Sequence, residues 1–113
     1  MHDVCAGDRI KQGDDWLKLW IPKLEAASQY QNGGAVLVTW DESEFNIPFC
    51  LASNCPIGMI VLSPLGKGGN YANTVPYDHS STLRSVQTIF GLTPYIRAAA
   101  SATDLHDLFT TFP

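Results

Sequence analysis

The stretch that decides the fold reads Ala35-Val36-Leu37-Val38-Thr39-Trp40, and two acids, Asp41 and Glu42, follow it directly. A continuous apolar run with β-branched residues is typical of a strand that is buried on both faces. The turn signal Gln31-Asn32-Gly33-Gly34 precedes this run. We therefore expect residues 35–40 to form a central strand of a parallel sheet.

A second apolar run, Gly58-Met59-Ile60-Val61-Leu62, precedes Ser63-Pro64 and predicts a second strand of the same kind. The residues between the two runs, from about 42 to 57, predict a polar loop. Both expected strands therefore end in loops, where side chains that carry chemistry are commonly placed.

Upstream of the strands, apolar residues recur on one helical face after Asp14 and Asp15, which are good N-cap types. This pattern predicts a helix from about residue 15 to 27. Pro22 falls inside the pattern and lacks an N–H group, so we expect the helix to kink or restart there.

Downstream of the strands, a second helical pattern opens at Ser80 or Ser81 and closes at Gly91. Its apolar stripe consists of Leu83, Val86, Ile89 and Phe90. Residues 104–109 predict a short last helix. Because helices alternate with buried strands, the pattern indicates an α/β fold with a parallel sheet. Two or three strands make a thin sheet of this kind, so the fold is expected to be incomplete.

Composition sets the outer limits of function. With 113 residues, of which 45% are hydrophobic and 16% charged, the chain forms one globular domain or part of one. Its net charge of −4 comes from scattered acids. The sequence has no basic stripe, which argues against binding to nucleic acid. Its longest apolar run, Gly58 to Leu62, is too short to span a membrane.

The cysteines indicate an oxidising compartment. Cys50 and Cys55 lie in the polar loop at a spacing that a disulfide can close, and Cys5 is left over. The alternative is three unrelated reduced thiols. The first residues, Met1 to Val4, have neither the basic region nor the apolar stretch of a secretory signal. An export signal is therefore expected upstream, or is absent.

Asp41 and Glu42 are the sharpest candidates for chemistry. They emerge where an apolar strand meets its C-terminal loop, which is the edge at which open α/β sheets place their ligands. Adjacent carboxylates repel each other and are easiest to keep ionised beside a divalent cation that both can bind. The alternative is a pair of solvated loop acids.

His79 precedes the second expected helix, whose free N–H groups favour anions, so it is a candidate for contact with a phosphate or a metal. The alternative is a surface histidine near an N-cap. His2 has no neighbouring pattern that indicates a role, and His106 is expected to be exposed on the polar face of the last helix. Residues 66–69, Gly-Lys-Gly-Gly, lack the spacing of a phosphate-binding P-loop and are interpreted as a flexible loop.

Five ordered blocks resemble one family: Met1-His2-Asp3, Gly13 to Leu17, Thr39-Trp40-Asp41-Glu42, Ser63-Pro64, and Pro76 to Arg84. They are similar to the C-terminal third of the phosphoesterase family of acid phosphatases and phosphatidylcholine-type phospholipases C, in the alkaline phosphatase superfamily. The resemblance implies a partial parallel-sheet α/β sandwich of the alkaline phosphatase-like type. Residues 1–113 would then be the C-terminal portion of a single phosphoesterase domain whose N-terminal portion is absent.

The resemblance also implies roles. Asp41 and Glu42 match the family's metal-binding acid pair, which implies one divalent metal ion of unknown identity. His2 matches a histidine that faces the phosphate, and His79 matches one at the edge of the active site. The family's nucleophile and its Glu-Asn metal motif lie upstream of the Met-His-Asp motif. We therefore expect hydrolysis of phosphate esters through a covalent phosphoenzyme in the intact protein, and little turnover from this chain alone.

The expected partners are a phosphate ester substrate and either the missing N-terminal portion or a second copy of the chain, without nucleic acid or stable membrane insertion. The resemblance implies a secreted or periplasmic protein. Two alternatives stay open: a sulfatase or phosphonate hydrolase of the same superfamily, and a noncatalytic remnant that serves as an interaction module.

Overall fold

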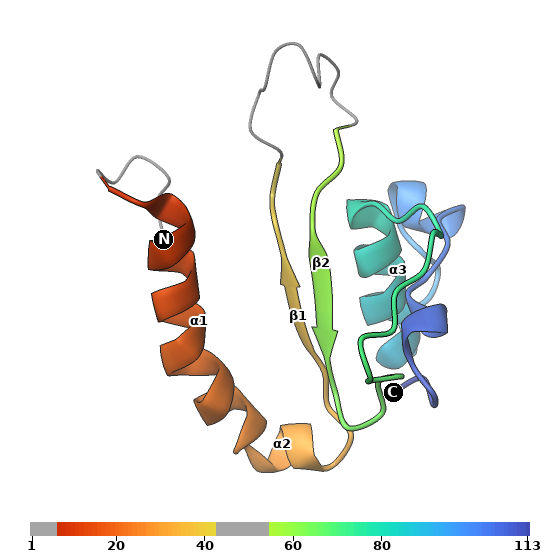
Figure 1. Cartoon of the computed structure of the whole chain (residues 1–113). Helices are drawn as coiled ribbons and strands as arrows, with labels where there is room; N and C mark the ends of the chain where they lie inside the picture. The colour runs from red at the N-terminus through yellow and green to blue at the C-terminus, as the bar shows by residue number, and fades with distance from the viewer. Residues whose placement is uncertain (1–6, 43–54) are drawn as a thin grey trace.

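The computed structural model describes residues 7–42 and 55–113 of the chain, which form a mixed arrangement of helices and strands (Figure 1). In chain order the elements are α1 (Arg9–Glu25), α2 (Ser28–Gln31), β1 (Val36–Thr39), β2 (Met59–Leu62), α3 (His79–Ile89), η1 (Arg97–Ala100) and η2 (His106–Leu108), the last two being 3-10 helices. In Figure 1, α1 lies on one side of the strand pair, and α3 lies with the C-terminal segment on the other.

The two apolar runs form strands, but the predicted parallel sheet is wrong for the described residues. β1 pairs with β2 in the antiparallel sense, from Val36 opposite Leu62 to Thr39 opposite Met59. The chain leaves β1 and enters β2 at the same end of the pair, so no crossover connection is needed. An apolar run does not encode the direction of its neighbour. The strands are also half-buried or exposed, where burial on both faces was expected.

Helix α1 begins earlier than predicted. Asp8 is its N-cap, and the side chain of Asp8 accepts a hydrogen bond from the backbone N–H of Lys11 (3.0 Å). The first turns are polar, and the pair Lys11–Asp15 (2.6 Å) stabilises them on the surface. The helix continues through Pro22 to Glu25 without restarting. No residue of α1 is buried, and on the apolar face that predicted the helix only Leu17 and Ile21 are half-buried, so the described residues cover this face only in part.

Helix α3 forms where it was predicted, starting two residues earlier. Asp78 is the N-cap and makes a reciprocal capping box with Ser81. The buried side chains are Ser81, Ser85 and Gln87, whereas most of the predicted apolar stripe is exposed, with Phe90 at 72%. The polar face packs inward and makes most of its hydrogen bonds there, as Ser85 shows by bonding both Ser81 and Leu105, whereas the buried hydroxyl of Thr82 has no partner among the described residues.

The core of the described residues is small and lies under α3. Its buried apolar side chains are Ala99, Leu105 and Phe109. The C-terminal segment is tied to the loop after β2 by backbone hydrogen bonds, from Lys67 to Leu108 (3.1 Å) and from Thr110 to Leu65 (2.8 Å). The expected last helix is confirmed as a single 3-10 turn, η2.

The surface of the chain is large for its mass. Its accessible area is 8445 Å² at 12.4 kDa, whereas a compact monomer of that mass exposes about 6100 Å². Large apolar side chains account for part of the excess, among them Ile10, Trp16, Leu19, Phe90, Leu92 and Ile96. The described elements thus leave apolar surface uncovered.

In the described residues no helix is long and apolar enough to cross a membrane.

Candidate active site

A cleft of about 880 Å³ lies where the end of the strand pair meets the N-terminus of α3. Three of the four residues singled out from the sequence line it: Asp41, Glu42 and His79. The fourth, His2, lies outside the described residues. β1 carries the acid pair to the rim, and the capping box of α3 fixes the backbone from which His79 projects.

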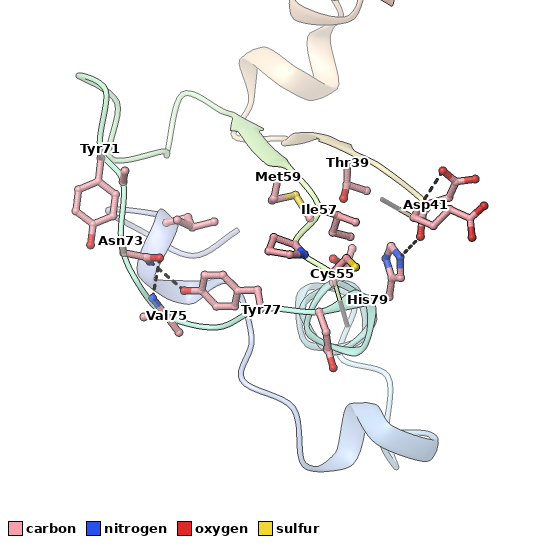
Figure 2. Close-up of a pocket in the computed structure, with 16 residues that line it drawn as sticks. Thr39, Asp41, Cys55, Ile57, Met59, Tyr71, Asn73, Val75, Tyr77 and His79 are labelled. Carbon is pink, nitrogen blue, oxygen red and sulfur yellow. Dashed lines mark hydrogen bonds between the residues drawn. The ribbon is translucent and has the colours of Figure 1, made fainter. Parts of the chain in front are cut away.

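A hydrogen bond joins the candidate residues across the cleft. The Nε2 atom of His79 lies 2.7 Å from the backbone carbonyl oxygen of Asp41 (Figure 2). Because a carbonyl oxygen only accepts, Nε2 must carry the proton, which leaves Nδ1 as the nitrogen available for a ligand. His79 is therefore held by one ring nitrogen and presents the other.

The two acids are exposed and unneutralised. One oxygen of the Asp41 carboxylate accepts the backbone N–H of Glu42 (3.0 Å). No Lys or Arg of the described residues forms an ion pair with either carboxylate. Within the part of the chain that the structure describes, no ion pair therefore occupies their other oxygens.

The cleft is acidic at this end. Among the described residues, its lining contains the carboxylates of Asp41, Glu42 and Asp78 and no Lys or Arg. A phosphate group carries negative charge of its own, so it is repelled here unless a cation comes between. Phosphate binding at this cleft therefore requires a positive charge that the described lining does not supply.

The opposite wall of the cleft was not predicted. Asp107 accepts hydrogen bonds from Tyr71 (2.6 Å), Asn73 (2.6 Å) and Lys67 (2.9 Å). These hydrogen bonds, that of Tyr71 first, hold the pKa of the Asp107 carboxyl well below its ordinary value. The loop that was interpreted as flexible is thus anchored through Lys67. No local pattern could have revealed it, since Asp107 lies 40 residues from Lys67 in the sequence.

Cys55 also lines the cleft and is disulfide-bonded. The expected partner, Cys50, lies outside the described residues, as does Cys5. The expectation of oxidised cysteine therefore holds for Cys55.

Comparison with known families decides the lineage, because the model of the Phosphoesterase family matches residues 1–93. The chain belongs to the Phosphoesterase family. Its members are hydrolases of phosphoric esters and generally depend on a metal ion. Neither the curated proteins nor the solved structures include a match to this chain. The match contains Asp41, Glu42 and His79, whereas Asp107 lies beyond it.

The described residues supply only part of a phosphoesterase metal centre. Asp41 and Glu42 offer carboxylate oxygens, which are the donors that hard divalent cations prefer. Within residues 7–42 and 55–113, however, no three side chains of His, Cys, Asp or Glu gather as a metal site. The donor chemistry therefore fits a divalent cation, and the number of donors does not complete its coordination.

Proposed function

We propose that this chain provides part of the active site of a metal-dependent phosphoesterase of the acid phosphatase or phospholipase C type. The observation that carries the proposal is the convergence of Asp41, Glu42 and His79 on one acidic cleft. In the complete protein, the ester would be cleaved through a covalent phosphoenzyme that water then hydrolyses.

Asp41 and Glu42 are proposed to hold one divalent cation. When bound, that cation offsets the charge on the phosphoryl oxygens. The proposal is supported by the acidic lining, which otherwise repels phosphate, and by the fact that neither carboxylate forms an ion pair with another described residue. Both of these donors are oxygens, which suit Mg²⁺, Mn²⁺ and Ca²⁺, and the identity of the metal depends also on the remaining ligands.

His79 is proposed to contact a phosphoryl oxygen, or to protonate the departing alcohol, through Nδ1. Its Nε2–H is already used by the carbonyl of Asp41, which fixes the orientation of the ring. His2 is proposed as a second contact to the phosphate on the basis of its motif alone.

The nucleophile and the remaining metal ligands are proposed to lie in another portion of the phosphoesterase domain, of which residues 1–113 form the C-terminal part. The uncovered apolar surface supports this division of the domain, because an intact domain of this size would bury more of it. Little turnover is expected from these residues alone. The disulfide at Cys55 supports a secreted or periplasmic location, since disulfides persist in oxidising compartments.

The proposal is tested by titrating Mn²⁺ into the 113-residue chain and following the binding by isothermal calorimetry. Changing Asp41→Asn together with Glu42→Gln should weaken Mn²⁺ binding about tenfold or more, because both charged donors are lost. Asp14→Asn with Asp15→Asn is the matched control, since this adjacent acid pair lies on α1 and should leave the titration unchanged. Equal Mn²⁺ affinity in all three proteins would overturn the metal assignment.

A second titration tests His79 with inorganic phosphate. We expect phosphate to bind the wild-type chain only when Mn²⁺ is present. His79→Gln keeps a nitrogen near Nε2 for the Asp41 carbonyl but lacks Nδ1, so it should weaken phosphate binding several-fold. His106→Gln, on exposed η2, is the control and should have no effect. Phosphate binding that is as tight in His79→Gln as in the wild type would contradict the role of Nδ1.

A noncatalytic interaction module is the second candidate, and the exposed apolar side chains favour it. Such a module needs no cation. The same Mn²⁺ titration therefore separates the two functions, because absence of any binding to the wild-type chain supports the module.

A further inference from the structure

The cleft has two ends of opposite chemistry. Asp41 and His79 lie at the acidic end, whereas Tyr71, Asn73 and Tyr77 lie at the other, with Ile57 and Met59 between them (Figure 2). A cleft of about 880 Å³ has the size of sites that enclose whole small molecules. A phosphate group alone would fill only the acidic end.

The far end presents ring surface. Its lining is formed by Tyr71, Asn73, Val75, Tyr77 and Leu108, which we call the aromatic wall. The Tyr71 hydroxyl donates to Asp107 (2.6 Å), and the Tyr77 oxygen accepts from Asn73 (3.2 Å), so the O–H of Tyr77 is the one hydroxyl donor that the described residues leave on the wall. Besides that single donor, the wall offers a ligand the apolar surface of the rings and of the aliphatic side chains.

The aromatic wall offers no free cation for a phosphate. Lys67 is the nearest candidate, but its Nζ donates to Asp107 (2.9 Å) and also lies 4.4 Å from the centre of the Tyr71 ring. Its charge is therefore neutralised on the wall itself. This argues that the wall receives the uncharged part of a substrate.

The aromatic wall is held in place by Asp107, which lies far from it in the sequence. Asp107 binds Lys67, Tyr71 and Asn73 at once, so it fixes the segment that carries the wall. Rings that are held in place lose less conformational entropy when a ligand packs on them. Asp107 is thus a positioning residue, and it lies outside the part of the chain that matches the family.

We propose that the aromatic wall is the subsite for the alcohol part of the ester, and that the substrates are phosphate monoesters of planar aromatic alcohols. The inference rests on the proposed function, since the acidic end would take the phosphate. In the reaction, the bond between phosphorus and the alcohol oxygen breaks, and water supplies the oxygen and protons that yield inorganic phosphate and the free alcohol. Planar rings pack against Tyr71 and Tyr77 in offset or edge-to-face contacts.

The test uses 2-naphthol, the alcohol without its phosphate, in calorimetric titrations of the 113-residue chain without metal. We expect 2-naphthol to bind, and Tyr71→Ala to weaken it about 3- to 10-fold, the range that loss of an aromatic contact predicts. Tyr30→Ala removes a tyrosine that does not line the cleft and should leave the affinity unchanged.

Conservative variants keep the test decisive if Tyr71→Ala does not fold. Asp107→Asn should weaken 2-naphthol about threefold, because Lys67 and Tyr71 lose their charged acceptor. Asp15→Asn breaks a lysine–aspartate pair on α1, away from the cleft, and should have no effect. Circular dichroism checks that each variant is folded. Failure of 2-naphthol to bind, or equal affinity in wild type, Tyr71→Ala and Asp107→Asn, overturns the inference.

Failure of this inference can be distinguished from failure of the proposed function. Binding of 2-naphthol needs neither metal nor phosphate, whereas the Mn²⁺ and phosphate titrations need no aromatic ligand. If 2-naphthol binds to the wall but no cation binds to Asp41 and Glu42, the subsite is supported and the phosphoesterase chemistry is contradicted. If Mn²⁺ and phosphate bind and 2-naphthol does not, the proposed function stands and the substrate class is wrong.

Discussion

At the scale of single residues, the position of the acid pair depends on a contact between Trp40 and Gly58. A Cβ atom added to Gly58 would lie 2.0 Å from Cζ3 of Trp40, so the ring occupies the space that any other residue would need. Thr39 reinforces the contact by donating its hydroxyl to the carbonyl oxygen of Gly58 (2.9 Å). Asp41 follows Trp40 directly, and its backbone is therefore placed by this packing.

Gly58→Ala should displace the Trp40 ring and destabilise the chain by about 1–3 kcal/mol, the usual cost of overpacking. Urea unfolding followed by tryptophan fluorescence measures the loss. In a Trp40→Ala background the same substitution has no ring to displace and should cost little. A cost that is equal in the two backgrounds would show that the contact does not determine the effect.

At the scale of elements, α3 connects the cleft to the core. Its first turn carries His79, and its buried face carries Ser85. The Ser85 hydroxyl donates to the carbonyl oxygen of Ser81 (2.8 Å) and accepts the backbone N–H of Leu105 (2.8 Å). Leu105 is fully buried, so its N–H has no access to water in place of Ser85.

Ser85→Ala should therefore destabilise the chain by about 1–3 kcal/mol, because it leaves the buried N–H of Leu105 without an acceptor. The measurement is the free energy of unfolding in urea. Ser101→Ala is the control, since the exposed hydroxyl of Ser101 makes only a long hydrogen bond to Ala98 (3.4 Å). If the two variants lose the same stability, the hydrogen bond to Leu105 is not the cause.

At the scale of the whole molecule, Asp107 joins the C-terminal segment to the wall of the cleft. Its carboxylate accepts hydrogen bonds from Tyr71, Lys67 and Asn73. Asn73 also donates to Tyr77, which links Tyr77 indirectly to Asp107. Hydrogen bonding lowers the pKa of Asp107, and the bond to Asp107 raises the pKa of Lys67. A lowered carboxyl pKa adds stability above the ordinary value of 3.8, and that stability is lost as the pH falls through the folded-state pKa.

The stability difference between wild type and Asp107→Asn should therefore stay constant across neutral pH. It should shrink as the pH falls below about 3.8, and also as the pH rises above 10.5 through the raised pKa of Lys67. Urea unfolding of both proteins at a series of pH values gives this difference. A difference that titrates between pH 5 and 8 would instead assign the effect to a histidine, of which His106 is the nearest in sequence.

The whole molecule also explains why so many of the apolar residues that predicted the helices are exposed. The apolar residues of α1 and of the α3 stripe are present as predicted, but most of them face outward. Burial requires an opposing surface, and the described residues provide one only under the polar face of α3. A periodic pattern predicts a helix and a face, and it does not predict which face meets a neighbour.

The sequence by itself determined what depends on local chemistry: two apolar runs that become strands, a helix that starts beside Ser81, an acid pair at the end of β1, and membership of the Phosphoesterase family. Only the tertiary structure decided the antiparallel pairing, the inward polar face of α3, and the bond from His79 to Asp41, 38 residues away. It alone placed Asp107 behind the aromatic wall. The physical reason is that caps and periodicity act over a few residues, whereas pairing direction and distant hydrogen bonds depend on how the whole chain packs.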